Sequence, residues 1–315
     1  MKTAAAEKGS PMATVGVLCA RGRVEENAIM AALAEAGIVS ALFPPADEPL
    51  PVGPMSPSPT GRPFPVPQIV VDRHPTRQVA RAVLATCNAL EVPALCAGIA
   101  ATGDRLDVAS TLATYGLPRP LTALCTSEDA ALEAVAAMGL PATLLPLDLR
   151  SAAIPLLDPD AAEAVLEHRA VLGGVDGSLG LIQAGSPDTE NQVNVIVVDG
   201  VATALETASN SSVPDQALML AEEAARALNA DLVAIVIAFG FGELVVWDAY
   251  PVPDFRNAVP IADLTVAQAV AQAVERRLAA VVPGLPAGRN PAWPSISTRA
   301  QKQGQGLRRD LVISA

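Results

Sequence analysis

The segment that decides how this chain folds begins with Gly103-Asp104-Arg105 and ends with Asp254-Phe255-Arg256-Asn257. Between these ends lie three more motifs: Gly139-Leu140-Pro141-Ala142-Thr143-Leu144-Leu145-Pro146, Val165-Leu166-Glu167-His168-Arg169-Ala170-Val171-Leu172-Gly173-Gly174 and Ile182-Gln183. Glycines end apolar helical runs at Gly139 and at Gly173-Gly174, where a left-handed residue commonly terminates a helix. The pattern predicts helices over 104–115, 128–138 and 159–172, and strands over 121–125 and 142–147.

The residues before this segment predict a parallel sheet covered by helices. Strands are expected over 14–19, 38–43, 68–72 and 93–96, with helices over 25–36 and 76–89. Glu25 and Glu26 open the first helix; they are candidates for an acid pair, but we expect a solvated acidic turn. Residues 44–67 are so rich in proline that they predict a long surface loop.

The residues after Gln183 predict an antiparallel sheet and two helices. Strands are expected over 192–198, 201–206, 232–238 and 243–247, and helices over 214–228 and 266–282. Asp199-Gly200 joins the first two strands and is a strong signal for a type I′ hairpin turn.

Composition limits the functions that the chain can have. Its 315 residues are 51% hydrophobic and only 3% aromatic, and its net charge of -12 argues against general binding to nucleic acid or to anionic membranes. Lysine is absent from residue 9 to residue 301. The four cysteines and two histidines form no zinc pattern, so we expect buried reduced thiols in a cytoplasmic protein.

In their order and spacing the five motifs resemble the nucleotide-binding half of ATP-grasp ligases. The nearest resemblance is to the LysX-like enzymes of lysine biosynthesis and to the related RimK-like ligases, and it covers residues 14–262. It implies an α/β chain with the ATP-grasp fold and an N-terminal parallel-sheet (pre-ATP-grasp) domain. The expected divisions are a flexible leader 1–13, an N-terminal domain 14–101 with the proline-rich loop 44–67, a small ATP-grasp subdomain 102–184, a C-terminal subdomain 185–283 and an irregular basic tail 284–315.

The resemblance assigns nucleotide binding to positions that have mostly changed. Arg105 stands where the family has its first phosphate-binding lysine, and Leu145 stands in place of the second. The family's glycine-rich loop corresponds to residues 149–152, which contain no glycine but include Arg150. If a nucleotide is bound, the resemblance gives it to Arg105, Arg150 and Gln183.

The positions that hold magnesium in the family have changed as well. They correspond to Val236, Asp248 and Tyr250, so one carboxylate of three ligands remains, and a hard cation needs several oxygen ligands. Trp247 and Tyr250 are expected either to fill the volume of the nucleotide and metal or to line a new pocket. The motif Asp254-Phe255-Arg256-Asn257 resembles the family's Glu-Phe-Lys-Asn beside the substrates, which makes Asp254, Arg256 and Asn257 the substrate-side candidates.

Three hypotheses for function follow. The first is a non-catalytic ATP-grasp homologue that binds or regulates a protein partner, such as an active paralogue, a carrier protein or copies of itself. The second is an active ligase that uses ATP and Mg²⁺ to join an amino acid such as α-aminoadipate to a carrier protein. The third is a structural subunit held by the proline-rich loop and the tail. No catalytic residue and no cofactor is assigned by the first and third hypotheses.

Overall fold

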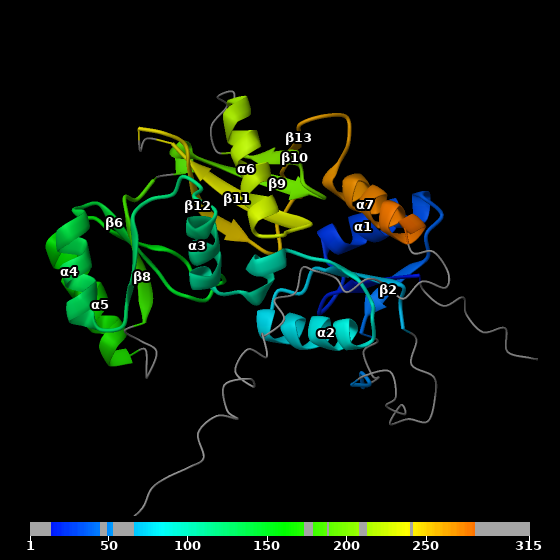
Figure 1. Ribbon diagram of the computed structural model, residues 1–315, viewed down its shortest axis with the longest axis horizontal. Coiled ribbons are helices and arrows are strands. Elements are labelled where there is room, and N and C mark those ends of the chain that lie inside the picture. Colours follow the sequence, from blue (N-terminus) through cyan, green and yellow to red (C-terminus); the bar gives the residue numbers. More distant parts are fainter. Residues whose placement is uncertain are drawn as a thin grey trace, which may run out of the picture.

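The computed structural model describes residues 14–44, 49–52, 66–172, 179–187, 189–207, 213–239 and 242–280. The expected leader 1–13, most of the proline-rich loop, Gly173-Gly174 and the tail 284–315 lie outside these residues. Strands of the described part form three sheets, and helices cover them (Figure 1).

The N-terminal sheet is parallel and has the strand order β2-β1-β3-β4. Strands β1, β3 and β4 are buried and mostly apolar, as parallel strands covered by helices usually are, whereas the edge strand β2 is partly exposed. The elements of this part are β1 (Val15–Leu18), α1 (Val24–Glu35), β2 (Ser40–Phe43), β3 (Ile69–Asp72), α2 (Arg77–Ala89), β4 (Ala94–Leu95) and the 3-10 helix η1 (Gly98–Thr102).

The second sheet is antiparallel, with the order β5-β8-β6-β7. Helices α4 and α5 pack on it and close a separate apolar core (Figure 1). The elements of this part are α3 (Arg105–Thr114), β5 (Thr122–Cys125), α4 (Glu128–Met138), β6 (Ala142–Leu145), β7 (Ile154–Leu156), α5 (Pro159–Leu172) and β8 (Gly180–Ala184). The sequence pattern missed β7 because it has three residues, one of them Pro155, which an edge strand tolerates.

The third sheet is antiparallel, has five strands in the order β12-β11-β9-β10-β13 and carries a core on each face. Val193, Val195 and Val197 of β9 face one core, whereas Ile196 and Val198 face the other, because side chains alternate along a strand. The elements are η3 (Thr189–Asn191), β9 (Gln192–Val198), β10 (Val201–Glu206), α6 (Asp215–Ala227), β11 (Leu232–Ala238), β12 (Val245–Tyr250), β13 (Val259–Pro260) and α7 (Val266–Ala280).

The N-terminal sheet and the five-stranded sheet share one core. Helix α7 lies beside α1 (Figure 1), and its Val270 and Val274 pack in the same cluster as Ile29 and Leu33. The backbone N–H of Ile99 donates to Leu228 O at 2.8 Å, and that of Asp231 donates to Cys96 O at 2.7 Å. Arg277 binds Asp231 at the same junction. The two parts therefore pack as a continuous body.

Most elements predicted from the sequence are present within a few residues of their expected ends. The turn residues Asp199 and Gly200 have φ values of 50° and 80°, as the predicted hairpin requires. The prediction for β12 was wrong at both ends, because a turn at Gly242 delays the strand and the pairing with β11 extends it to Tyr250. Asp248 thus lies inside β12, and Tyr250 is the last residue of this strand.

The four cysteines are free and buried, as expected. No helix among the described residues is both long enough and apolar enough to span a membrane.

Candidate functional site

Arg105 begins helix α3, close behind the left-handed Gly103. Asp104 caps this helix by accepting a hydrogen bond from the N–H of Leu106 at 2.8 Å. The Arg105 side chain is 3% exposed and donates to Pro146 O at 2.7 Å, to Asp148 O at 3.0 Å and to Asp248 Oδ2 at 3.0 Å. The guanidinium that the resemblance assigns to a phosphate thus forms hydrogen bonds with acceptors of the protein itself.

Asp248 is the partner of Arg105 and lies on β12 opposite Val236 of β11. Tyr250 follows two residues later, and burial together with the charge of Asp248 raises the pKa of its hydroxyl. Burial raises the pKa of the Asp248 carboxyl above its ordinary value, although the Arg105 guanidinium opposes this shift. The structure brings the three predicted metal positions together, but it pairs their single carboxylate with an arginine. Among the described residues no three His, Cys, Asp or Glu side chains gather as metal ligands.

A small cavity next to this pair, the Gln183 cavity, is lined by residues that include Arg105, Leu145, Gln183, Trp247 and Asp248. Its volume is about 20 Å³. A cavity needs roughly 10–15 Å³ on this measure to hold one water molecule. Gln183 also bonds within the protein, accepting from Thr122 Oγ1 at 3.1 Å and donating to Trp247 O at 3.3 Å. The apolar side chain of Leu145 is 2% exposed and fills part of the same region.

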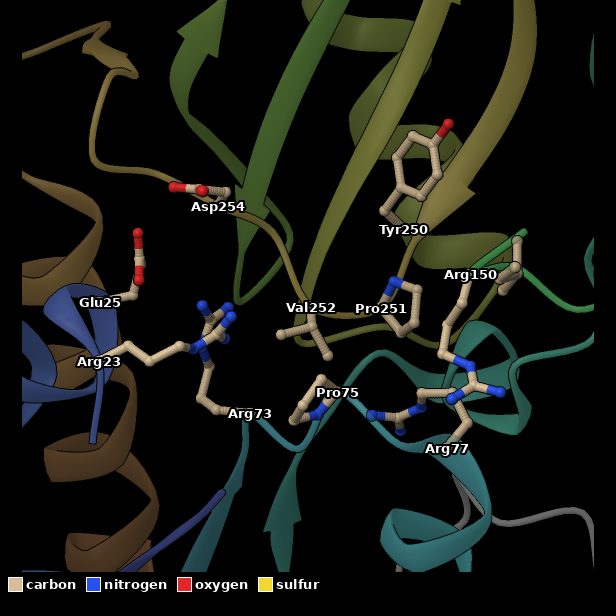
Figure 2. Close-up of a pocket in the computed structure, with 11 residues that line it drawn as sticks. Arg23, Glu25, Arg73, Pro75, Arg77, Arg150, Tyr250, Pro251, Val252 and Asp254 are labelled. Carbon is tan, nitrogen blue, oxygen red and sulfur yellow. The ribbon is translucent and has the colours of Figure 1, made fainter. Parts of the chain in front are cut away.

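A larger cavity, the arginine cavity, lies between the N-terminal sheet and the segment after β12 (Figure 2). Its volume is about 190 Å³. The lining includes Arg23, Glu25, Arg73, Arg150, Val252 and Asp254. Arg150 lies at one end of it, half-exposed and paired with Asp148 at 2.8 Å. The hydrogen bond from Arg150 lowers the pKa of Asp148.

Glu26 anchors two arginines at the other end of the arginine cavity. It accepts from Arg23 Nε and from Arg73 Nε, both at 3.2 Å. Burial opposes the ionisation of Glu26, but the hydrogen bonds from Arg23 and the charge of Arg73 together lower its pKa. Arg73 itself is fully buried, and its guanidinium lies over the Phe255 ring at 5.2 Å from the centroid.

The expectation that Glu25 and Glu26 form a solvated turn was wrong. Both are buried, at 1% and 0% exposure, because arginines from distant parts of the chain cover them. Arg256 Nε donates to Glu25 Oε1 at 2.9 Å and to Asp254 Oδ1 at 3.2 Å. Two of the three substrate-side candidates therefore meet the first turn of α1, whereas Asn257 is exposed and lies outside the lining of both cavities.

Sequence reasoning missed Arg73, although one signal was present. Asp72 is the last residue of the buried strand β3, and Arg73-His74 directly follow it at the carboxyl edge of a parallel sheet. Ligands bind outside this edge in open α/β sheets. Asp72 forms an ion pair with Arg77. The Nη2 of Arg77 donates to Asp72 Oδ2 at 2.6 Å and to Ala101 O at 2.9 Å. Arg73 and Arg77 are thus both buried and both line the arginine cavity, and the guanidinium of Arg77 is hydrogen-bonded to Asp72 and Ala101.

Solved structures of other proteins match this arrangement. A RimK domain ATP-grasp protein from Sphaerobacter thermophilus is 25% identical, with a TM-score of 0.67 over 82% of this chain and 98% of that chain. The ATP-grasp ligase PsnB, solved with a precursor peptide and AMPPNP, is 14% identical, with a TM-score of 0.61 over 84% and 97%. D-alanyl-alanine synthetase A from Vibrio cholerae is 12% identical, with a TM-score of 0.61 over 85% and 99%. The chain has the ATP-grasp fold. No family model matches its sequence.

The residues that the sequence resemblance assigns to the nucleotide and the metal do not fit ATP and magnesium. Arg105 and Asp248 are bonded to each other, and Leu145 and Val236 are buried apolar side chains. Phosphates require converging cations and Mg²⁺ requires several oxygens, and this arrangement offers neither. The cavity beside these positions has room for about one water molecule.

Proposed function

We propose that this ATP-grasp protein is a non-catalytic homologue that acts by binding. The observation that carries the proposal is the ion pair between Arg105 Nε and Asp248 Oδ2 at 3.0 Å, in which both side chains are almost fully buried. The pair uses the remaining cation at the first phosphate position to neutralise the remaining carboxylate at the metal positions. Catalysis of phosphoryl transfer relies on charged groups that interact with the reacting atoms. In this protein the charges of Arg105 and Asp248 neutralise each other instead.

For the partner we propose a protein: an active paralogue, a carrier protein or further copies of this chain. The net charge of -12 disfavours nucleic acid and anionic membranes as partners. Free buried thiols are typical of proteins kept in reducing compartments, which supports a cytoplasmic location.

An active carboxylate-amine ligase of the RimK-like or LysX-like type is the second candidate. The arginine cavity favours the ligase, because Arg150 and Arg73 are cations that line it together with Asp254, one of the substrate-side candidates. Arg150 is 55% exposed and pairs with Asp148, so it is free to change partners at little cost. Under this alternative an amino acid is joined to a carrier protein, as in lysine biosynthesis.

Calorimetric titration of the purified chain with ATP and Mg²⁺ decides between the two candidates. We expect no heat and no thermal shift at millimolar nucleotide. Micromolar binding that depends on magnesium, or consumption of ATP with an acceptor, would overturn the non-catalytic proposal. Asp248→Asn is the matched variant, because it removes the one carboxylate at the expected metal positions. If magnesium-dependent binding heat persists in this variant, the metal binds elsewhere on the protein.

A further inference from the structure

Strand β5 forms an outer edge of the second sheet and has no protection against pairing with another strand. It pairs with β8 on one side in a regular register, and no strand of the described residues pairs with it on the other side. Exposed edges are usually protected by charged side chains, by proline or by a bulge. The stretch from Leu121 to Ser127 contains neither charge nor proline. Leu121 and Leu124 are 67% and 46% exposed, so this edge offers an apolar site for a further strand.

Two residues of β5 present backbone groups at this outer edge. The N–H of Ala184 donates to Leu121 O at 2.9 Å, so Leu121 and Ala123 direct their hydrogen-bonding groups toward β8. Because these groups alternate along an antiparallel strand, the N–H and C=O of Thr122 and Leu124 point outward. Outside β5 and β8, no described residue forms a backbone hydrogen bond with either of them. An added strand can therefore bond to both.

Charge distinguishes the edge of β5 from the other outer edges of the sheets. Residues 102–184, which include β5, contain four arginines and eleven acidic residues and no lysine, a net charge of -7. Residues 14–101, which include the edge strand β2, contain six arginines and seven acidic residues, a net charge of -1. The edge strands β7 and β13 contain Pro155 and Pro260, which lack the N–H of a strand residue. The edge of β5 therefore suits a strand that is apolar and basic.

Residues 307–315, with the sequence Leu-Arg-Arg-Asp-Leu-Val-Ile-Ser-Ala, have this composition. They lie outside the described residues. The run Leu-Val-Ile at 311–313 has a high propensity for strand, and no proline occurs after Pro294. Residues 284–315 together contain five basic residues and one acidic residue, a net charge of +4. This charge is opposite to that of the residues around β5.

We propose that residues 307–315 add to the outer edge of β5 of the same molecule as an antiparallel strand. This direction brings Arg308 and Arg309 close to Glu128 and Asp129, which begin α4 directly after β5. Helices α7 and α4 lie at opposite ends of the molecule (Figure 1). The 26 residues 281–306 can extend to roughly 90 Å, whereas a compact chain of this size has a radius of gyration of about 18 Å. The connection from α7 is therefore long enough, and a protein partner that pairs with β5 must first displace the segment.

Hydrogen exchange at single amides, measured by NMR on the 315-residue chain, tests this pairing. The outward amides of Thr122 and Leu124 should be protected. Val312→Pro removes an N–H from the added strand and should speed their exchange by about 10-fold or more. The amide of Ala123 points toward β8 and should change little. Gln303→Pro is the matched control, because it makes the same kind of change outside residues 307–315 and should leave the exchange unaltered.

Salt and protein concentration complete the test. Protection of Thr122 and Leu124 should weaken as the ionic strength rises, because salt screens the attraction between the basic segment and the acidic residues around β5. Rapid exchange of both amides in the wild type, or an equal effect of Gln303→Pro, would overturn the proposal. Protection that grows with protein concentration would also overturn it, because the strand would then come from a second copy. Unchanged slow exchange in β11 shows that each variant is folded, and no outcome depends on whether the chain binds ATP.

Discussion

At the scale of single residues, the buried pair of Arg105 and Asp248 makes a strong prediction about stability. Both side chains are almost fully buried, at 3% and 5% exposure. Removing one member of such a pair leaves an uncompensated charge and costs about 3–5 kcal/mol. Arg105→Met should therefore lower the free energy of unfolding by about this amount at neutral pH, as measured by urea denaturation. A variant as stable as the wild type would show that the pair does not form.

The cost of Arg105→Met should also depend on pH. Burial raises the pKa of Asp248 in the folded state, and the substitution removes the cation that opposes this shift. The folded variant then binds a proton that the unfolded chain releases, so its stability rises as the pH falls from neutral toward the ordinary carboxyl pKa and is lost as the pH rises. The double variant Arg105→Met, Asp248→Asn lacks the carboxylate and should lose this dependence.

Sequence analysis identified these residues as site candidates but did not predict the ion pair between them. It singled out Arg105 and Asp248 separately, as nucleotide and metal groups, but they are 143 positions apart and no local pattern reports that they bind each other. Glu25 was misread for the same reason, because its partner Arg256 is 231 positions away. Local patterns give backbone conformation, whereas the pairing of buried charges depends on how distant elements pack.

At the scale of elements, Gly103 connects η1 to α3 and gives the next prediction. Its φ is 79°, and a Cβ at this position would lie 2.6 Å from Arg77 Cβ. Gly116, which follows α3, has a φ of 69°, but a Cβ there would have no neighbour within 4 Å. Gly116→Ala should cost about 1 kcal/mol from backbone strain alone. Gly103→Ala should cost about 1–3 kcal/mol more, because Arg77 must move. Equal losses in urea denaturation would contradict this packing.

The elements themselves were largely predictable because their signals are local. Gly103-Asp104 marks a helix start, and Asp199-Gly200 marks a hairpin. The short edge strand β7 and the true ends of β12 were not predictable, because pairing with neighbouring strands defines them. The fold could therefore be inferred from sequence, while the arginine cavity could not, because it forms only where β3, α1 and the segment after β12 converge.

At the scale of the whole molecule, the distribution of apolar cores predicts the order in which Cys125, Cys87 and Cys96 become reactive. The cluster around Cys125 contains only residues of the second sheet and its helices α4 and α5. The N-terminal sheet shares a core with the five-stranded sheet and α7, and the cluster on its other face contains Cys87 of α2 and Cys96. Since sub-global opening follows such cooperative units, the second sheet should open first, and the N-terminal and five-stranded sheets should open together.

Alkylation followed by peptide mass spectrometry, over a series of denaturant concentrations, measures this order. Native thiols should react slowly, because burial raises the pKa of Cys19 to about 11 and those of Cys87 and Cys96 to about 12. Cys125 should become labelled at lower denaturant than Cys87 and Cys96, which should react together at the global transition. Labelling of the fully unfolded chain corrects for intrinsic reactivity. Simultaneous labelling of all four thiols would mean that the second sheet has no independent stability, although its core is separate.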